Sequence, residues 1–436
     1  MRVLMFGWEF PPHISGGLGT ACYGLTRGMA SIPGLDILFV VPRAYGDEDQ
    51  SRIRILGAND VPIDVRKLRQ KKYLKDLSYI EINSNLVPYT SPEEYEKLVK
   101  KAENQGKRLV ETRTGGKISF TGKYGKNLFE EIANYAIVAG EIAQTREFDI
   151  IHAHDWLTYP AGIAARRASG KPLIVHVHAT DFDRSGGNVN PGVFEIERMG
   201  MHLADKVIAV SNLTRNTVIN KYGIDPAKVE TVYNAVDPIP DHEKLKLRRG
   251  ITDKVVTFLG RVTMQKGPEY FIQAAHKVLQ KMDNVRFVMA GSGELLEKMI
   301  HWTAALGISD RFHYTGFLKG DDVHRMFSIS DVYVMPSVSE PFGISPLEAM
   351  QSNVPSIISN QSGVSEILKY AFKVDFWDVD AMADAIYGLL NYSALSRMFS
   401  KYGIHEVNDM KWENSGKRAF SVYKEFVQET HHKRNT

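Results

Sequence analysis

Short apolar segments rich in β-branched residues alternate with helical segments along almost the whole chain, and this alternation constrains the fold more than any other feature. Segments that are nearly continuous in Val, Ile, Leu and Phe are typical of strands buried on both faces of a parallel sheet. In the first half they are Val3–Gly7, Ile37–Val41, Ile150–Ala153, Leu173–His178 and Val207–Val210. In the second half they are Val255–Leu259, Arg286–Ala290, Phe312–Thr315, Val332–Met335 and Ser356–Ile358. The pattern exceeds what one sheet usually holds, so it predicts an α/β protein with two doubly wound domains.

Composition excludes several classes of protein. Of the 436 residues, 43% are hydrophobic and 24% are charged, which is typical of a folded globular chain. Lys and Arg number 54 against 51 for Asp and Glu, a net charge of +3, so the chain lacks the basic excess of a nucleic-acid-binding protein. A single cysteine, Cys22, excludes an intrachain disulfide and a cysteine-based zinc site and fits a reducing compartment. No apolar segment approaches the ~18 residues of a membrane span, and the N-terminal one is too short for a signal peptide. We therefore expect a cytoplasmic protein with no membrane span and no nucleic-acid partner.

Breaks in the alternation indicate the domain limits. The boundary is expected near Asn234–Glu243, because the two prolines and two acids of Asn234–Asp241 are typical of a linker. The polar, Lys-rich stretch from Arg43 to Gly125 is too long for a simple loop, and we interpret it as an insertion with some structure. The segment Ser415–Glu429 is amphipathic and predicts a packed helix.

A glycine-rich turn follows the first predicted strand. Gly16, Gly17 and Gly19 precede a predicted helix, where glycines let a ligand approach the backbone and the helix N-terminus favours an anion. The third glycine of a dinucleotide fingerprint is missing, and no Gly-Lys-Ser/Thr of a P-loop follows. Ligand contact and a simple tight turn both remain open.

Histidine pairs lie at the ends of two predicted strands, His152 with His154 and His176 with His178. Ligands bind at the carboxyl ends of parallel strands, and the i, i+2 spacing places each pair on one face. With Asp155 or Asp181 they could hold a divalent ion for hydrolysis, or they could hydrogen-bond a sugar or phosphate. Burial in the core with backbone partners is the third alternative.

Two cations follow the first strand of the second half. The strand ends at Gly260, and Arg261 and Lys266 stand on the turn that leads to a helix opened by Pro268. An arginine fork and a lysine point charge at a strand end suit a diphosphate, whereas the alternative is a pair of solvated surface cations.

The segment after the strand Val332–Met335 carries two glutamates, of which only one has a structural explanation. Ser345 and Glu348 have the spacing of a capping box with Pro346 at the first helical position, so Glu348 has a structural explanation. Glu340 precedes the turn and has no such structural explanation, so it is the better candidate for a functional carboxylate. The loop Gly343–Ser345 would offer backbone N–H groups at a helix N-terminus.

Together these motifs resemble the retaining GT-B glycosyltransferases, and within them the glycogen- and starch-synthase-like group. The matching segments are Gly16-Gly17-Leu18, His152-Ala153-His154-Asp155-Trp156, Val210-Ser211, Tyr233 to Asp237, Gly260 to Gly267, Ala290 to Gly293, and Glu340-Pro341-Phe342-Gly343 with Glu348. The combination of Arg261 and Lys266 with Glu340 and Glu348 is the most specific part. Ile14, with His13 just before it, stands where bacterial glycogen synthases carry the lysine of Lys-x-Gly-Gly-Leu.

The resemblance implies two Rossmann-like domains facing across a cleft. Residues 1–236 would form the acceptor-side domain, with the insertion at about 43–125, and a C-terminal helix at about 412–436 would complete it. Residues 237–411 would bind the nucleotide sugar.

The resemblance also implies a role for each matching residue. The catalytic set would be Arg261 and Lys266 on the donor diphosphate, Glu340 on the transferred glucose and His178 beside the sugar. The donor-binding set would be Gly16, Gly17, Gly291, Gly343, Ile344, Ser345 and Glu348, with Glu348 on the ribose. His154 and Asp155 would lie on the acceptor side.

The expected reaction transfers glucose from ADP-glucose or UDP-glucose to the non-reducing end of an α-1,4-glucan, with retention and without a metal or other cofactor. The partners would be a nucleotide sugar and an oligo- or polysaccharide. Three alternatives stay open: the same chemistry on a sucrose-, trehalose- or envelope-type acceptor, a metal-dependent hydrolase built on the strand-end histidines, and a nucleotide-sugar-binding protein without turnover.

Overall fold

A computed structural model of the chain describes residues 1–14, 16–63, 116–125, 127–239, 250 and 252–434, with side chains described up to residue 426. The described chain divides into two compact units, Met1–Asn234 with Trp412–Thr436 and Ala235–Lys411. Most of the expected insertion at 43–125 lies outside the described residues.

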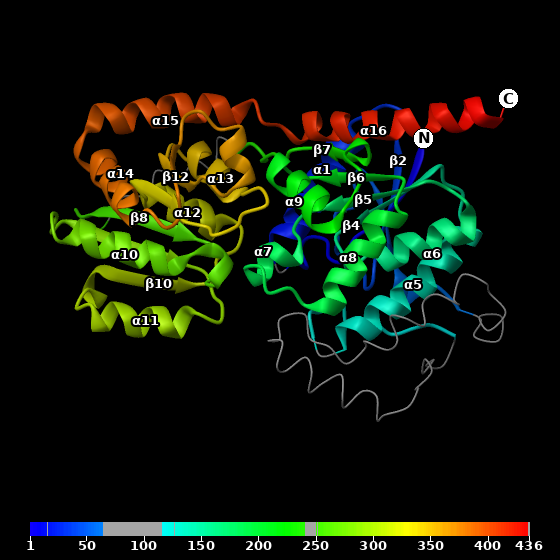
Figure 1. Cartoon of the computed structure of the whole chain (residues 1–436), viewed down its shortest axis with the longest axis horizontal. Coiled ribbons are helices and arrows are strands. Elements are labelled where there is room, and N and C mark those ends of the chain that lie inside the picture. The colour runs from blue at the N-terminus through cyan, green and yellow to red at the C-terminus, as the bar shows by residue number, and fades with distance from the viewer. Residues whose placement is uncertain (15, 64–115, 126, 240–249, 251, 435–436) are drawn as a thin grey trace. The chain divides into compact units, whose positions relative to one another are not determined.

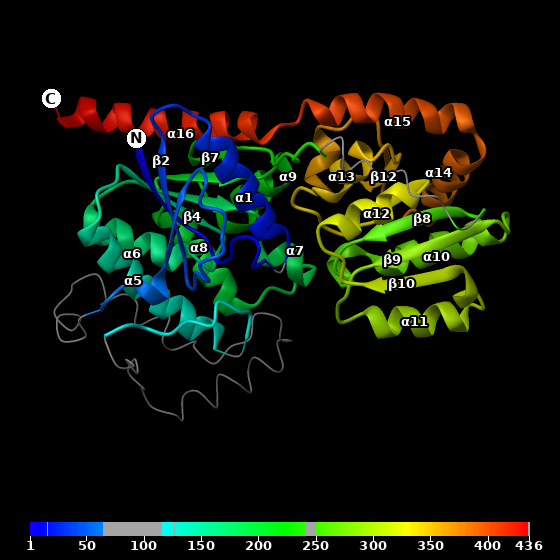
Figure 2. The same ribbon diagram turned by 180° about the vertical axis from the view of Figure 1, so that it is seen from behind.

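The first unit is built on a seven-stranded parallel sheet of order β3-β2-β1-β4-β5-β6-β7. Its strands are β1 (Arg2–Phe6), β2 (Asp36–Val41), β3 (Arg54–Gly57), β4 (Ile150–His154), β5 (Leu173–Val177), β6 (Lys206–Ala209) and β7 (Val229–Thr231). Its helices are α1 (Gly17–Ala30), α5 (Leu128–Thr145), α6 (Tyr159–Ser169), α7 (Asp181–Ser185), α8 (Pro191–Leu203), α9 (Asn212–Tyr222) and α16 (Trp412–Arg434). In Figures 1 and 2, α1 and α16 lie on one face of this sheet and α5, α6 and α8 on the other. The strands β4 and β5 are buried along their whole length, as expected for central parallel strands.

Helix α16 joins the first unit through two glycines of α1. A Cβ atom at Gly24 would stand 2.1 Å from the Trp412 indole, and one at Gly28 would stand 2.1 Å from the Trp412 carbonyl oxygen. Only glycine lets the two helices approach so closely. Ala419, Val422 and Tyr423 of α16 are fully buried, which explains the amphipathic pattern of this segment.

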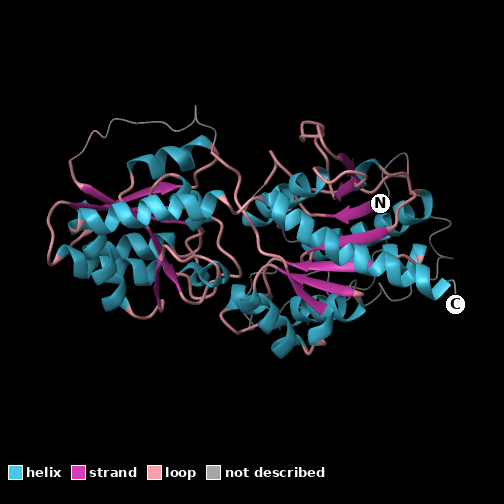
Figure 3. Ribbon diagram, turned by 90° about the horizontal axis from the view of Figure 1, so that it is seen from above, coloured by secondary structure: helices cyan, strands magenta, loops and turns pink. Residues whose placement is uncertain are grey.

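The second unit is built on a six-stranded parallel sheet of order β10-β9-β8-β11-β12-β13. Its strands are β8 (Lys254–Leu259), β9 (Val285–Ala290), β10 (Phe312–Gly316), β11 (Val332–Met335), β12 (Ser356–Ser359) and β13 (Phe372–Val374). Its helices are α10 (Pro268–Leu279), α11 (Leu296–Ala305), α12 (Asp321–Ile329), α13 (Ser345–Gln351), α14 (Val379–Asn391) and α15 (Ser393–Asn408). Helix α10 packs against α11 and α14, and α13 packs against α15. Figure 3 shows the strands of each unit layered between helices.

The predicted fold class is confirmed, since both units are doubly wound parallel α/β sheets. Each predicted strand is present, within two residues of the expected bounds. The sequence analysis missed β3, β7 and β13, which are short strands at or near the sheet edges and carry few apolar residues. Among the described residues, no helix combines the length and apolarity that crossing a membrane requires.

Candidate functional site

Each sheet has one point where the order of its strands reverses direction, and most of the predicted site residues follow the strands on either side of these points. In the second unit the reversal lies between β8 and β11, and in the first it lies between β1 and β4. Ligands of open α/β sheets bind at such switch points, outside the carboxyl ends of the strands. One set of predicted site residues belongs to each unit.

Arg261 and Lys266 lie on the turn that follows β8. Arg261 is exposed and donates a hydrogen bond to Oε1 of Gln265 at 3.4 Å. Gln265 is buried and donates in turn to the Ser339 carbonyl at 3.1 Å, so it connects this turn to the loop after β11. The turn closes at Gly267, whose φ of 64° favours glycine and whose Cβ position lies 2.1 Å from the Pro336 carbonyl oxygen.

Lys266 forms an ion pair with Glu340, the carboxylate that follows β11. Glu340 is buried, and its Oε2 also accepts a hydrogen bond from the Ser337 hydroxyl at 3.2 Å. Its backbone is fixed as well, because the Glu340 N–H donates to the Gln361 carbonyl and the Gly363 N–H donates to the Glu340 carbonyl, both at 2.9 Å. The structure therefore joins the two predicted catalytic groups across the switch point.

The predicted capping box at Ser345 and Glu348 is wrong. Ile344 is the N-cap of α13, and no side chain of the described chain caps this helix end. The Ser345 hydroxyl instead hydrogen-bonds the Tyr333 hydroxyl of β11 at 2.7 Å, because the helix starts one residue earlier than the capping box requires. Glu348 is thereby left without the cap that explained it, and desolvation by the surrounding protein raises its pKa to about 7.

Two glycines shape the backbone of this site. Gly343 has a φ of 101°, and its Cβ position lies 3.2 Å from the Glu340 side chain. Gly291, after β9, has a φ of 142°, and its Cβ position lies 1.8 Å from the Gly260 carbonyl oxygen. Both positions therefore require glycine, and Gly291 allows the ends of β8 and β9 to touch.

In the first unit, Gly16 and Gly17 begin α1 with no atom within 4 Å of their Cβ positions. Their small size is thus not needed for packing against the described residues, and it leaves this backbone open. Gly19, one turn further, does pack tightly, with its Cβ position 2.4 Å from Ile14.

Asp155 connects the ends of β4 and β5. Its backbone has a φ of 62°, uncommon for a residue other than glycine, and its Oδ1 accepts hydrogen bonds from the N–H groups of His178 at 3.2 Å and Ala179 at 3.4 Å. Desolvation raises its pKa to about 6, although Arg184 lies 3.8 Å away and opposes the shift. The carboxylate of Asp155 thus holds the backbone that carries His178.

A buried ion network behind Asp155 escaped the sequence analysis. Arg184 pairs with Glu197 at 2.5 Å and lies 3.7 Å from Asp181, and the Tyr222 hydroxyl donates to Glu197. Burial raises the pKa of Glu197 to about 8 despite the nearby guanidinium. The sequence signal is the run Asp181-Phe182-Asp183-Arg184, in which acids and an arginine directly follow a buried strand.

The four strand-end histidines meet in one stack, in which three are buried and His178 is partly exposed. Ring centroids of His152 and His154 are 4.3 Å apart, as are those of His176 and His178, and Tyr423 of α16 hydrogen-bonds His152. Desolvation lowers the pKa of His152 and of His178 to about 3 and that of the other two well below the usual value, so all four are neutral near pH 7. His154 and His178 are joined by a ring-to-ring hydrogen bond of 3.0 Å.

Comparison with known proteins identifies the family and the fold of the chain. Residues 105–239 match the sequence model of Glycosyltransferase Family 4, and residues 241–406 match that of Glycosyl transferases group 1. Among solved structures, the sucrose-phosphate synthase of Thermosynechococcus elongatus is similar with a TM-score of 0.71 at 15% identity, covering 98% of this chain and 99% of that one. HepE of Anabaena, in complex with UDP and glucose, is similar with a TM-score of 0.68 at 15% identity, covering 97% of this chain and 99% of that one. The fold is therefore that of the GT-B enzymes.

Curated relatives extend over most of the chain. An uncharacterized glycosyltransferase of Methanocaldococcus jannaschii is 27% identical, covering 97% of this chain and 98% of the relative. The D-inositol 3-phosphate glycosyltransferase of Salinispora tropica is 28% identical, covering 65% of each chain. The chain belongs to the GT-B glycosyltransferases, and it is a transferase of the group 1 type.

Proposed function

We propose that this protein transfers glucose from ADP-glucose or UDP-glucose to an acceptor hydroxyl, with retention of configuration and without a metal ion. The observation that carries the proposal is the group formed by Arg261, Lys266 and Glu340 around the switch point of the second sheet. Family membership supports sugar transfer. HepE, which was solved with UDP and glucose, supports a nucleotide-glucose donor.

The diphosphate leaving group sets the main electrostatic demand of the reaction. The Arg261 guanidinium is exposed and can hold phosphate oxygens in a bidentate manner, while the Lys266 ammonium has three N–H groups, of which one bonds Glu340. The backbone of Gly343, Ile344 and Ser345 adds N–H donors at the start of α13. Fixed positive groups of this kind can stabilise the leaving diphosphate in the role that a metal ion fills elsewhere.

Glu340 would stabilise the positive charge that develops on the sugar. Its ion pair with Lys266 and the hydrogen bond from the Ser337 hydroxyl hold it in place. A phosphate oxygen of the donor would take the acceptor proton, which gives retention without a covalent sugar–enzyme intermediate. Trapping of a glucosyl ester on Glu340 would contradict this route and assign the nucleophile role instead.

Glu348 would bind the donor ribose, and Gly291 would leave room for the donor. His178 would lie beside the sugar, and His154 and Asp155 on the acceptor side. Gly16 and Gly17 would offer their open backbone to the donor. These roles rest on the matching motif positions.

The acceptor has two candidates. The glycogen- and starch-synthase-like motifs favour the non-reducing end of an α-1,4-glucan. Two of the similar proteins favour a small acceptor instead, since their names specify inositol 3-phosphate and a sucrose-phosphate product. Ile14, at the position of the glycogen synthase lysine, also favours this second candidate.

A donor-by-acceptor panel tests the proposal. ADP-glucose, UDP-glucose and nucleotide derivatives of other sugars would be incubated with glycogen, inositol 3-phosphate and fructose 6-phosphate, with and without EDTA. We expect one nucleotide-glucose to be consumed, an α-linked product by NMR, and the same rate in EDTA. Loss of all transfer in EDTA, or a β-linked product, would contradict the metal-free retaining mechanism.

A further inference from the structure

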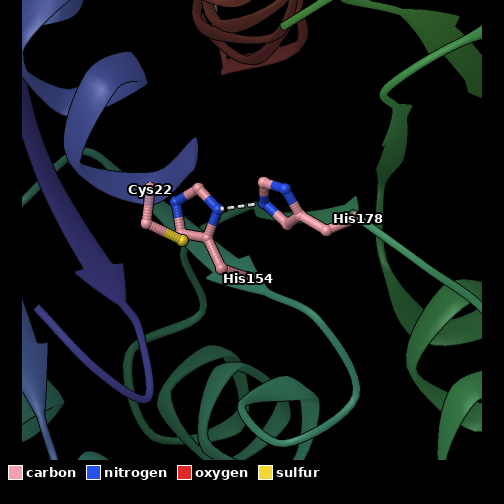
Figure 4. A group of neighbouring side chains, drawn as sticks. All are labelled: Cys22, His154 and His178. Carbon is pink, nitrogen blue, oxygen red and sulfur yellow. Dashed lines mark hydrogen bonds between the residues drawn. The ribbon is translucent and has the colours of Figure 1, made fainter. Parts of the chain in front are cut away.

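Cys22 lies beside the His154–His178 pair, although the three side chains come from distant parts of the sequence. Cys22 belongs to α1, His154 ends β4, and His178 follows β5 (Figure 4). The thiol sulfur of Cys22 and one ring nitrogen of each histidine all lie within 4.8 Å of one another. Cys22 is 1% exposed and His154 is fully buried, whereas His178 is partly exposed.

The orientation of the rings decides which histidines can share an ion. A metal binds in the plane of an imidazole, along the lone pair of its nitrogen. His152, His154 and His176 also approach within 4.8 Å, but their rings stack at interplanar angles of 13° to 28°, so their nitrogens lie in separate parallel planes. His154 and His178 instead point nitrogens at each other, Nδ1 to Nε2, at 3.0 Å.

The spacing of this pair is close to that of two ligands on one zinc ion. With Zn–N bonds of about 2.0–2.1 Å and tetrahedral angles, two nitrogens stand roughly 3.4 Å apart. The Cys22 sulfur lies within 4.8 Å of a ring nitrogen of each histidine, where a Zn–S bond of about 2.3 Å would place sulfur and nitrogen roughly 3.6 Å apart. Among the described residues, the remaining nitrogens, Nε2 of His154 and Nδ1 of His178, are buried without a hydrogen-bond partner.

We propose that Cys22, His154 and His178 form an inhibitory Zn²⁺ site, in which the ion takes the place of the proton shared by the two rings. Thiolate and neutral imidazole are the ligands zinc prefers, and three protein ligands leave a fourth position for water. Binding releases the thiol proton to solvent, while the proton between the rings moves to an outer nitrogen, so each imidazole stays neutral. The net exchange is one Zn²⁺ in and one proton out.

Inhibition follows only if the proposed function is right, because that proposal places His178 beside the sugar and His154 on the acceptor side. An ion that occupies both rings removes their hydrogen bonds from the substrate. The metal-free reaction and the zinc site are therefore compatible, since zinc would act here as an inhibitor.

Cobalt spectroscopy of the full chain tests the site independently of transfer. Titration with Co²⁺ should give the intense near-ultraviolet band of a thiolate–cobalt bond, and Zn²⁺ should displace it. Cys22→Ala should lose the band and bind Zn²⁺ more than about 100-fold more weakly, since even outer-sphere partners of a metal contribute about 10–100-fold to its affinity. The closest variant in shape, Cys22→Ser, should behave in the same way. Zn²⁺ should raise the unfolding temperature of the unaltered protein and leave that of both variants unchanged.

His176→Gln is the matched control, because His176 belongs to the stacked set and not to the proposed one. It should keep the cobalt band. A missing band in the unaltered protein, or a band that survives Cys22→Ala, would overturn the site. In the transfer assay, Zn²⁺ should inhibit the unaltered protein and spare Cys22→Ala. Bound zinc without inhibition would overturn the inhibitory role and count against His178 as a sugar contact. Failure of transfer under all conditions would contradict the proposed function, while the cobalt titration would still decide whether the metal site exists.

Discussion

Lys266 donates a hydrogen bond to Oε2 of Glu340, and this ion pair joins the loops after β8 and β11 across the switch point of the second sheet. The two residues are 74 positions apart in the sequence. An ammonium has three N–H groups, so Lys266 can keep this bond and still bind an anion. The pair thus links the part of the proposed site that holds the leaving group to the part that faces the sugar.

Lys266→Ala should lower kcat by about 10²–10³, the usual loss when one donor to a developing anion is removed. Lys254→Ala is the matched control, because Lys254 stands at the start of β8, the strand that precedes the turn with Lys266. Its ion pair with Asp331 is partly exposed, with 3.6 Å between the charged atoms. It should retain nearly full activity. Steady-state kinetics measure both variants, and equal losses in the two would show that Lys266 acts through stability alone.

Glu348→Gln should change how stability depends on pH. In the folded protein the pKa of Glu348 is raised to about 7 from 4.5, so the folded state holds this proton more tightly than the unfolded state. The free energy of unfolding therefore falls on its account as pH rises from about 4.5 to 7, and stays lower above that. The variant should gain on the order of 3 kcal/mol over the unaltered protein between pH 4.5 and 8, because one pKa unit corresponds to about 1.4 kcal/mol.

Urea unfolding at several pH values measures this difference. Glu297→Gln is the control, since Glu297 is an exposed carboxylate on α11 with 88% of its side chain accessible. It should follow the pH profile of the unaltered protein. A parallel profile for Glu348→Gln would show that this carboxyl is not held protonated in the folded state.

Gly291→Ala should reduce both stability and transfer. Its Cβ would stand 1.8 Å from the Gly260 carbonyl oxygen, so the ends of β8 and β9 would have to separate beside the proposed donor site. Gly307→Ala is the control, because Gly307 also has a positive φ, 68°, but no described atom lies within 4 Å of its Cβ position. Thermal unfolding and donor KM should separate the two: Gly307→Ala shows only the backbone cost of about 1 kcal/mol, whereas Gly291→Ala also loses donor affinity.

Asp155→Ala should cost on the order of 2 kcal/mol in unfolding free energy, because it removes the acceptor of the half-buried N–H groups of His178 and Ala179 and places alanine at positive φ. Asp155→Asn should cost less, since asparagine keeps an acceptor oxygen and tolerates this φ. Chemical unfolding compares the two. Equal losses would mean that the carboxylate charge near Arg184, and not the hydrogen bonds, provides the stabilisation.

Most of the fold could be predicted from the sequence because buried parallel strands consist of nearly continuous apolar residues. Val255–Leu259 and Val332–Met335 are examples, and each lies within a residue of β8 and β11. The strand β13 (Phe372–Val374) could not be found in this way, because it has three residues with a lysine in the middle. The capping box at Ser345 also failed, because the hydroxyl of Tyr333, 12 residues away, competes for the serine.

The sequence by itself determined which chemical groups stand after which strands: Arg261 and Lys266 after one, Glu340 after another, and histidine pairs after two more. Only the tertiary structure decided which of them meet, because strand order depends on packing across the sheet and not on position along the chain. It paired Lys266 with Glu340, turned Asp155 toward the backbone of His178, and brought Cys22 against His154 from a helix more than a hundred residues away. Burial removes water as a competing partner, so each of these polar groups can bond only the protein groups that the fold places next to it.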